Sequence, residues 1–172
     1  DPSRIDLISE YWPELIEPLV KYNPRFVTKF FKYPELITQE IKKLVISLEP
    51  KMFKILPDPN FELMKYAISL DINNLDYIAY NQDLLDYAIS VNGLALKYVR
   101  KKDLRTIKNA LKQNINALDY IPYPRQFLID YAFAQDGLAL KYITNPTYEQ
   151  CLDAVKRNIE AIKYVPEIFK NN

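Results

Sequence analysis

The chain has 172 residues, enough for one domain or one segment of a repeat protein, and 49% of them are hydrophobic. Its formal net charge of +1 gives no overall attraction to nucleic acid or to an anionic membrane, and no apolar run is long enough to span a bilayer. Histidine is absent, which removes the usual general base and the commonest metal ligand, and two glycines are too few for a glycine-rich phosphate loop. A single cysteine excludes an internal disulfide and fits a reducing compartment.

Residues 1–59 carry two units in which an internal repeat is hard to follow. The first unit is expected over residues 15–31, where Ile16, Leu19 and Val20 have the i, i+3, i+4 spacing of one helix face. The second unit occupies the rest of this stretch and shows the same helical spacing of apolar residues. We describe both units as degenerate.

From residue 60 onward the units are regular, and each begins with an amphipathic helix of about 10–12 residues. An alanine lies ten residues before a tyrosine in every unit, with apolar residues around it at helical spacing. These alanines are Ala67, Ala88, Ala110, Ala132 and Ala154. A small side chain at this point predicts that a neighbouring helix crosses there at close range, because side-chain size sets the distance between helix axes.

A second helix of about two turns follows in each regular unit. Its expected N-cap is an aspartate or asparagine, whose side chain accepts from backbone N–H groups of the first turn. These caps are Asp71, Asn92, Asn114, Asp136 and Asn158. Gly93 and Gly137 follow two of the caps, where a glycine with positive φ is expected to close the preceding helix. A proline two residues beyond the tyrosine position ends the helix at Pro57, Pro122 and Pro166.

Tyrosines recur every 21 to 22 residues through the regular units, and a fixed period of this size is typical of stacked repeats. We therefore expect an all-α fold, an α-solenoid of about seven short antiparallel helical hairpins with a period of about 22 residues. The repeats form a single domain over residues 1–172, with degenerate units over 1–59 and regular units over 60–172. Because the chain opens inside a repeat, we interpret it as a fragment of a longer protein.

The N-terminal end of the chain is aromatic, whereas the terminal units of a solenoid need a polar outer face. Its aromatic residues include Trp12, Phe26, Phe30, Phe31 and Tyr33. We expect this end to pack on upstream units, on a partner, or on a second copy of the chain, because an exposed aromatic cluster is an association surface.

The segment from Ala154 to Asn158 and the ending Tyr164-Val165-Pro166-Glu167 resemble a helical repeat of unknown function. Units of that family read like A-V-K-x-N-G-x-A-L-x-Y-V-P-E, and the family occurs in proteins of giant amoeba-infecting DNA viruses and of some bacteria. The likeness covers residues 60–169 well and residues 1–59 loosely. It implies a viral origin, a location in the host cytoplasm or the virion, and an interaction role. The motif carries no catalytic residue and implies no cofactor.

The candidate interaction surface combines the repeated tyrosines with a short basic cluster. It consists of Tyr77, Tyr98, Tyr120, Tyr142, Tyr164, Arg100, Lys101 and Lys102. A row of aromatic rings suits a peptide or stacked bases, although the same rings could fill grooves between units, and Ile55 at the tyrosine position of an earlier unit favours burial. The basic cluster, with Arg105 and Lys108 close by, could hold phosphate or could be an ordinary solvated loop.

Other polar residues give no catalytic or metal-binding pattern. Cys151 stands where other units have leucine or isoleucine, which predicts a small buried core residue. One repeated position holds aspartate in some units and lysine in others, which indicates solvated helix faces. The residues at that position are Asp76, Lys97, Asp119, Lys141 and Lys163, and a second repeated position holds Asp86, Asp130 and Asp153.

We therefore expect a non-catalytic scaffold for protein–protein interaction, with no enzyme activity, no cofactor and no membrane association. A helical-repeat module that binds nucleic acid is the main alternative, and an accessory domain of a larger viral enzyme is a further one. A continuous basic stripe on the binding face would favour nucleic acid, whereas a mixed face would favour protein.

Overall fold

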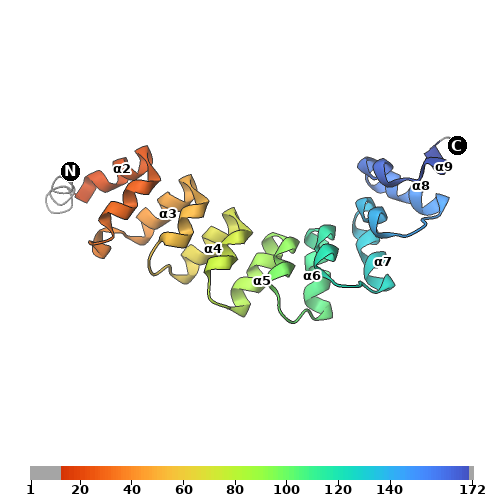
Figure 1. Cartoon of the computed structure of the whole chain (residues 1–172), viewed down its shortest axis with the longest axis horizontal. Coiled ribbons are helices and arrows are strands. Elements are labelled where there is room, and N and C mark those ends of the chain that lie inside the picture. The colour runs from red at the N-terminus through yellow and green to blue at the C-terminus, as the bar shows by residue number, and fades with distance from the viewer. Residues whose placement is uncertain (1–12, 171–172) are drawn as a thin grey trace. The chain divides into compact units, whose positions relative to one another are not determined.

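A computed structural model describes residues 13–170 of the chain. The chain divides into two compact units, residues 1–84 and 85–172, and each is described by itself. Over the described residues every regular element is a helix, and consecutive helices pack in contact within each unit (Figure 1). The fold is therefore all-α, as the sequence predicts. None of the helices between residues 13 and 170 has the length and apolar character needed to cross a membrane.

Two kinds of helix alternate along the first unit, α-helices and tighter 3-10 helices, the latter labelled η. In chain order they are η1 (Pro13–Leu15), α2 (Ile16–Tyr22), η2 (Pro24–Phe30), η3 (Pro34–Leu36), α3 (Gln39–Leu48), η4 (Pro50–Ile55), α4 (Phe61–Leu70) and η5 (Ile72–Tyr77).

The second unit repeats this alternation with greater regularity. Its elements are α5 (Gln82–Val91), which begins just before the division, then η6 (Gly93–Tyr98), α6 (Leu104–Gln113), η7 (Ile115–Tyr120), α7 (Gln126–Gln135), η8 (Gly137–Tyr142), α8 (Tyr148–Arg157), η9 (Ile159–Tyr164) and α9 (Glu167–Lys170).

The α-helices of the regular units confirm the predicted amphipathic helices in position and length. Each of α4 to α8 has 10 residues. Polar caps fix the starts of α4, α5, α6 and α8; for example, Asp103 accepts from the backbone N–H of Thr106 at 2.8 Å, and Thr147 forms a reciprocal capping box with Gln150. Arg125, which precedes α7, makes no side-chain cap bond. The five alanines expected at close crossings have no exposed surface.

The second helix of each regular unit is a 3-10 helix of six residues. All five predicted caps accept from the backbone N–H two residues on, as Asn92 does from Leu94 at 3.0 Å. Bonds from residue i to residue i+3 follow at once, such as the one that Ala95 N–H donates to the Asn92 carbonyl at 2.9 Å. An extended cap followed by only six helical residues leaves little room for α-helical bonding.

The expectation that the two glycines close the preceding helix with a positive φ is wrong. Neither Gly93 nor Gly137 has a positive φ. A Cβ atom on Gly93 would instead overlap the carbonyl oxygen of Ala110, and one on Gly137 would overlap that of Ala154. Glycine is required because the 3-10 helix lies directly on the backbone of the next α-helix, which also explains why the crossing residue is alanine.

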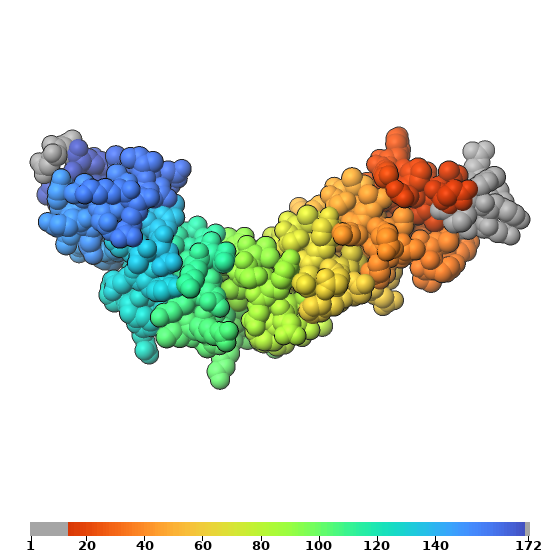
Figure 2. Space-filling view, turned by 180° about the vertical axis from the view of Figure 1, so that it is seen from behind, coloured from red at the N-terminus to blue at the C-terminus, as the bar shows by residue number. Residues whose placement is uncertain are grey.

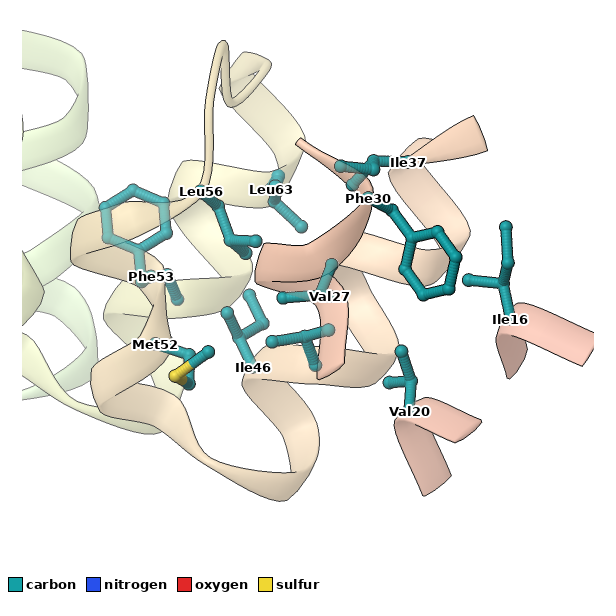
Figure 3. Close-up of a cluster of buried hydrophobic side chains, with 12 residues drawn as sticks. Ile16, Val20, Val27, Phe30, Ile37, Ile46, Met52, Phe53, Leu56 and Leu63 are labelled. Atoms are coloured by element: carbon teal, nitrogen blue, oxygen red, sulfur yellow. The ribbon is translucent and has the colours of Figure 1, made fainter. Parts of the chain in front are cut away.

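The first unit has a continuous core formed by both kinds of helix (Figure 3). Phe30 of η2 is 1% exposed, and in this view its ring lies next to Ile16 of α2. Ile16 and Val20 are buried and Leu19 is partly buried, which confirms the predicted core of this degenerate unit. Burial also removes Phe30 from the aromatic surface expected at the N-terminal end, while Phe31 remains 37% exposed. Trp12 lies outside the described residues.

In the second unit the repeats follow one another without interruption in the space-filling view (Figure 2). One buried cluster near its C-terminal end contains Leu140, Cys151, Ala154 and Ala161, contributed by η8, α8 and η9. Each repeat therefore completes its core with side chains from a neighbour. Helices of six to ten residues are marginal alone in water, so this packing is what stabilises them.

Candidate interaction surface

The last residue of each 3-10 helix from η6 to η9 is a tyrosine. These are Tyr98, Tyr120, Tyr142 and Tyr164, and we call them the tyrosine row. They belong to one unit, in which η6 packs closely against η7 and η8 against η9, while η7 has less contact with η8. The four rings stand at the equivalent position of successive repeats, and Tyr142 of η8 is bonded to Asp119 of η7.

Exposure along the tyrosine row is intermediate. Tyr98, Tyr120 and Tyr142 are half-buried, and Tyr164 is 36% exposed. Tyr77 ends η5 in the first unit and is described on its own, with 56% of its surface exposed. Ile55, taken from the sequence as a sign of burial at this position, is 38% exposed, so that interpretation is wrong.

Lysine side chains lie over three rings of the tyrosine row. The ammonium nitrogen is 4.7 Å from the ring centroid for Lys97 on Tyr98, and 4.6 Å for Lys141 on Tyr142. For Lys163 the ammonium nitrogen is 5.2 Å from the centroid of the Tyr164 ring. Cation–π attraction at these distances favours the contact between each partly exposed ring and its lysine.

Tyr142 is also tied to the preceding repeat. Its hydroxyl donates to Oδ1 of Asp119 at 2.7 Å. Burial raises the pKa of Tyr142 above the ordinary tyrosine value, and the hydrogen bond to Asp119 and the negative charge of that carboxylate raise it further. The Tyr164 hydroxyl contributes a smaller rise in the same direction. The row therefore carries an acidic group among its lysines.

Two residues in and beside the predicted basic cluster make local contacts. Arg100 and Lys101 are exposed in the loop between η6 and α6. Lys102 instead donates from Nζ to the carbonyl oxygen of Val99 at 2.7 Å, and Lys108 lies 5.2 Å from the centre of the Tyr131 ring. Two of the expected phosphate ligands are thus held in local contacts.

The remaining polar candidates lie where the sequence predicts. Cys151 is 3% exposed, and burial raises the pKa of its thiol. Asp153 accepts from Nε of Arg157 at 2.8 Å, and Asp130 accepts from Gln126 at 2.9 Å, both on exposed helix faces. Within residues 13–170 no group of three carboxylate or thiol side chains is placed to hold a metal ion.

Sequence reasoning missed a pocket in the second unit, with a volume of about 340 Å³. It lies between the ends of α6 and α7 and the starts of η7 and η8. The signal that could have revealed it is Ile115, which stands where the repeats on either side have Gly93 and Gly137. This difference could not be interpreted from the sequence alone, because it matters only if the glycines lie against the backbone of the next α-helix.

Comparisons with known protein families, with curated proteins and with solved structures find no match to this chain. The tyrosine row and this pocket are therefore the features of the chain from which a function can be inferred.

Proposed function

We propose that the chain is an α-solenoid of about seven helical hairpins, one 3-10 helix closing each regular hairpin, and that it binds a protein partner through the tyrosine row. The observation that carries the proposal is the mixed character of this row. Ordered, partly exposed aromatic rings alternate there with lysines and with Asp119. Aromatic residues held in one conformation lose little entropy on binding and are enriched at the energetic centres of protein interfaces.

The same observation disfavours the nucleic-acid alternative. A phosphate backbone is bound by repeated positive charge, and each unpaired carboxylate along the path weakens binding. Asp119 lies within the row, and Lys102 of the adjoining loop is engaged with Val99. A viral origin and a partner inside an infected cell, both implied by the family resemblance, belong to this proposal as well, as does self-association through the N-terminal end.

Affinity capture from infected cells tests the proposal, with and without nuclease. The test bait carries Tyr98→Ser and Tyr120→Ser. A matched control bait carries Tyr22→Ser and Tyr123→Ser, two tyrosines outside the row that are 85% and 98% exposed. Thermal melts first establish that both baits remain folded.

We expect a protein that wild-type and control baits retain, that the row variant loses, and that nuclease does not release. Release by nuclease would contradict the proposal in favour of nucleic acid. Equal retention by all three baits would show that the tyrosine row is not the binding surface.

A further inference from the structure

Two packing modes occur between successive repeats of the second unit. At Gly93 and Gly137 the 3-10 helix lies on the backbone of the following α-helix, at Ala110 and Ala154, with no room for a side chain. Ile115 occupies the equivalent place in η7, and its buried side chain needs space of its own. There η7 has little contact with η8, and α6 packs against α7 instead.

The pocket lies at this isoleucine step. Its polar lining comes from Lys112, Gln113, Asn114, Asn116, Gln135 and Asp136. Apolar side chains, Ile115 among them, complete the wall. The C-terminal end of α6 lines this pocket, and the last carbonyls of an α-helix have no partner within their own helix.

The next step of the same unit shows what fills the equivalent space. Arg157, at the end of α8, donates from Nη1 to the carbonyl oxygen of Ala134 in α7 at 3.2 Å. Its neighbour Asn158 donates from Nδ2 to Oδ1 of Asp136 at 3.0 Å. A guanidinium and an amide thus close the gap between α7 and α8, and Asp153 holds that guanidinium in place at 2.8 Å.

One repeat earlier the guanidinium and the cap amide are replaced while the acceptors remain. Gln135 stands in the place of Arg157, and Asp136 in the place of Asn158. Neither side chain bonds to α6 or η7 in the described part of the chain. The carbonyl of Lys112 and the side-chain oxygen of Asn114 correspond to the two acceptors that Arg157 and Asn158 use.

We infer that this pocket binds the guanidinium group of an arginine side chain from a partner polypeptide, an inference that rests on the proposed function. The carbonyls at the end of α6 attract a cation, and the planar guanidinium donates in several directions at once, as Arg157 does. Asp136 adds a carboxylate whose Oδ2 accepts no hydrogen bond from residues 13–170. Lys112 is exposed, so its ammonium group can extend into solvent.

The test is an NMR titration of the whole 15N-labelled chain with arginine blocked at both ends, as N-acetyl-arginine methylamide. We expect saturable shifts of the amide signals of residues 111–116 and 135–138, with a dissociation constant of about 1 mM. Blocked lysine and blocked citrulline, a neutral analogue of arginine, should bind at least about tenfold more weakly.

Three variants locate the site. Asp136→Asn should weaken binding about tenfold because it removes the charged acceptor. Asparagine is the native cap in three other repeats, so the fold is retained. Asp130→Asn makes the same charge change outside the pocket and should have no effect. Gln135→Arg should abolish binding, because it places a guanidinium of the chain itself where Arg157 lies one repeat later.

Four results would overturn the assignment: equal binding of citrulline or of lysine, shifts confined to other residues, unchanged affinity of Asp136→Asn, or free L-arginine binding more than about tenfold tighter than the blocked form. The last would mean a small guanidino compound rather than a polypeptide. The proposed function fails separately, in the capture experiment on the tyrosine row. If blocked arginine causes no shifts, but the row variant still loses the captured protein, only the assignment of the pocket is refuted.

Discussion

Single residues of this chain take their properties from the neighbouring repeat. Cys151 lies in a cluster with Leu140 and Ala154, and burial raises the pKa of its thiol because the thiolate is poorly solvated there. Tyr142 reaches back to Asp119 of the preceding repeat. Both residues can therefore report on whether the repeats are packed together.

Cys151 should react with a thiol reagent slowly in the native state and freely in denaturant. Since only the exposed thiolate reacts, we expect native labelling to be roughly a hundredfold slower or more. Release of thionitrobenzoate, followed by absorbance, measures the rate. The control combines Cys151→Ser with Asn109→Cys, a substitution at an exposed position of α6. Native rates as fast as the control would contradict the burial of Cys151.

Stability should fall with rising alkaline pH through Tyr142. Because its pKa is raised in the folded state, folded chains hold the hydroxyl proton more tightly than unfolded chains. The contribution is therefore complete below the unfolded tyrosine pKa of about 10 and is lost as pH rises through the folded value. Urea unfolding across pH 8 to 11 should show a steeper loss for wild type than for Tyr142→Phe. Parallel curves would show that the pKa of Tyr142 is not raised in the folded chain.

For the helices, the sequence predicts well where each one begins and ends. It predicts poorly which type of helix forms and how that helix packs on its neighbour. Asp103 and Asn92 mark helix starts because a cap acts locally, and Pro122 marks an end for the same reason. Six residues of i, i+3 spacing do not separate a 3-10 helix from an α-helix, so that type was not predictable. The requirement for Gly137 comes from the backbone at Ala154, which local sequence does not contain.

Some features of the candidate site also follow from the repeat period, whereas others depend on packing between repeats. The tyrosines follow from the period, because each lies on the same position of one repeat. The lysines beside them share a position with Asp76 and Asp119, so the sequence predicts them only as solvated side chains. Ile55 is exposed although it is apolar, because packing sets exposure and the local sequence does not contain that packing. The pocket beside Ile115 arises from a difference between repeats, which a search for similarity overlooks.

Gly137→Ala should destabilise the chain, although this change commonly stabilises a helix by about 0.5–1 kcal/mol. The added methyl meets the carbonyl of Ala154, so we expect a loss of roughly 1–3 kcal/mol in the free energy of unfolding. Ile159→Ala, at the same position of the last repeat and 70% exposed, should change it by less than about 0.5 kcal/mol. Urea denaturation measures both, and a neutral or stabilising Gly137→Ala would contradict the close contact.

At the scale of the molecule, the central claim is that repeats stabilise one another through contacts with their immediate neighbours. Elements of the second unit contact those next in the chain, and no long helix spans several repeats within the described residues. Stability should then depend on the number of repeats present rather than on one central core.

Melting of nested fragments tests this claim most directly. Fragments 122–172, 100–172 and 79–172 contain two, three and four α-helices of 10 residues. Circular dichroism should show a melting temperature that rises with each added repeat, because every addition contributes one more interface. Equal melting temperatures for fragments of two, three and four repeats would contradict stabilisation by neighbours.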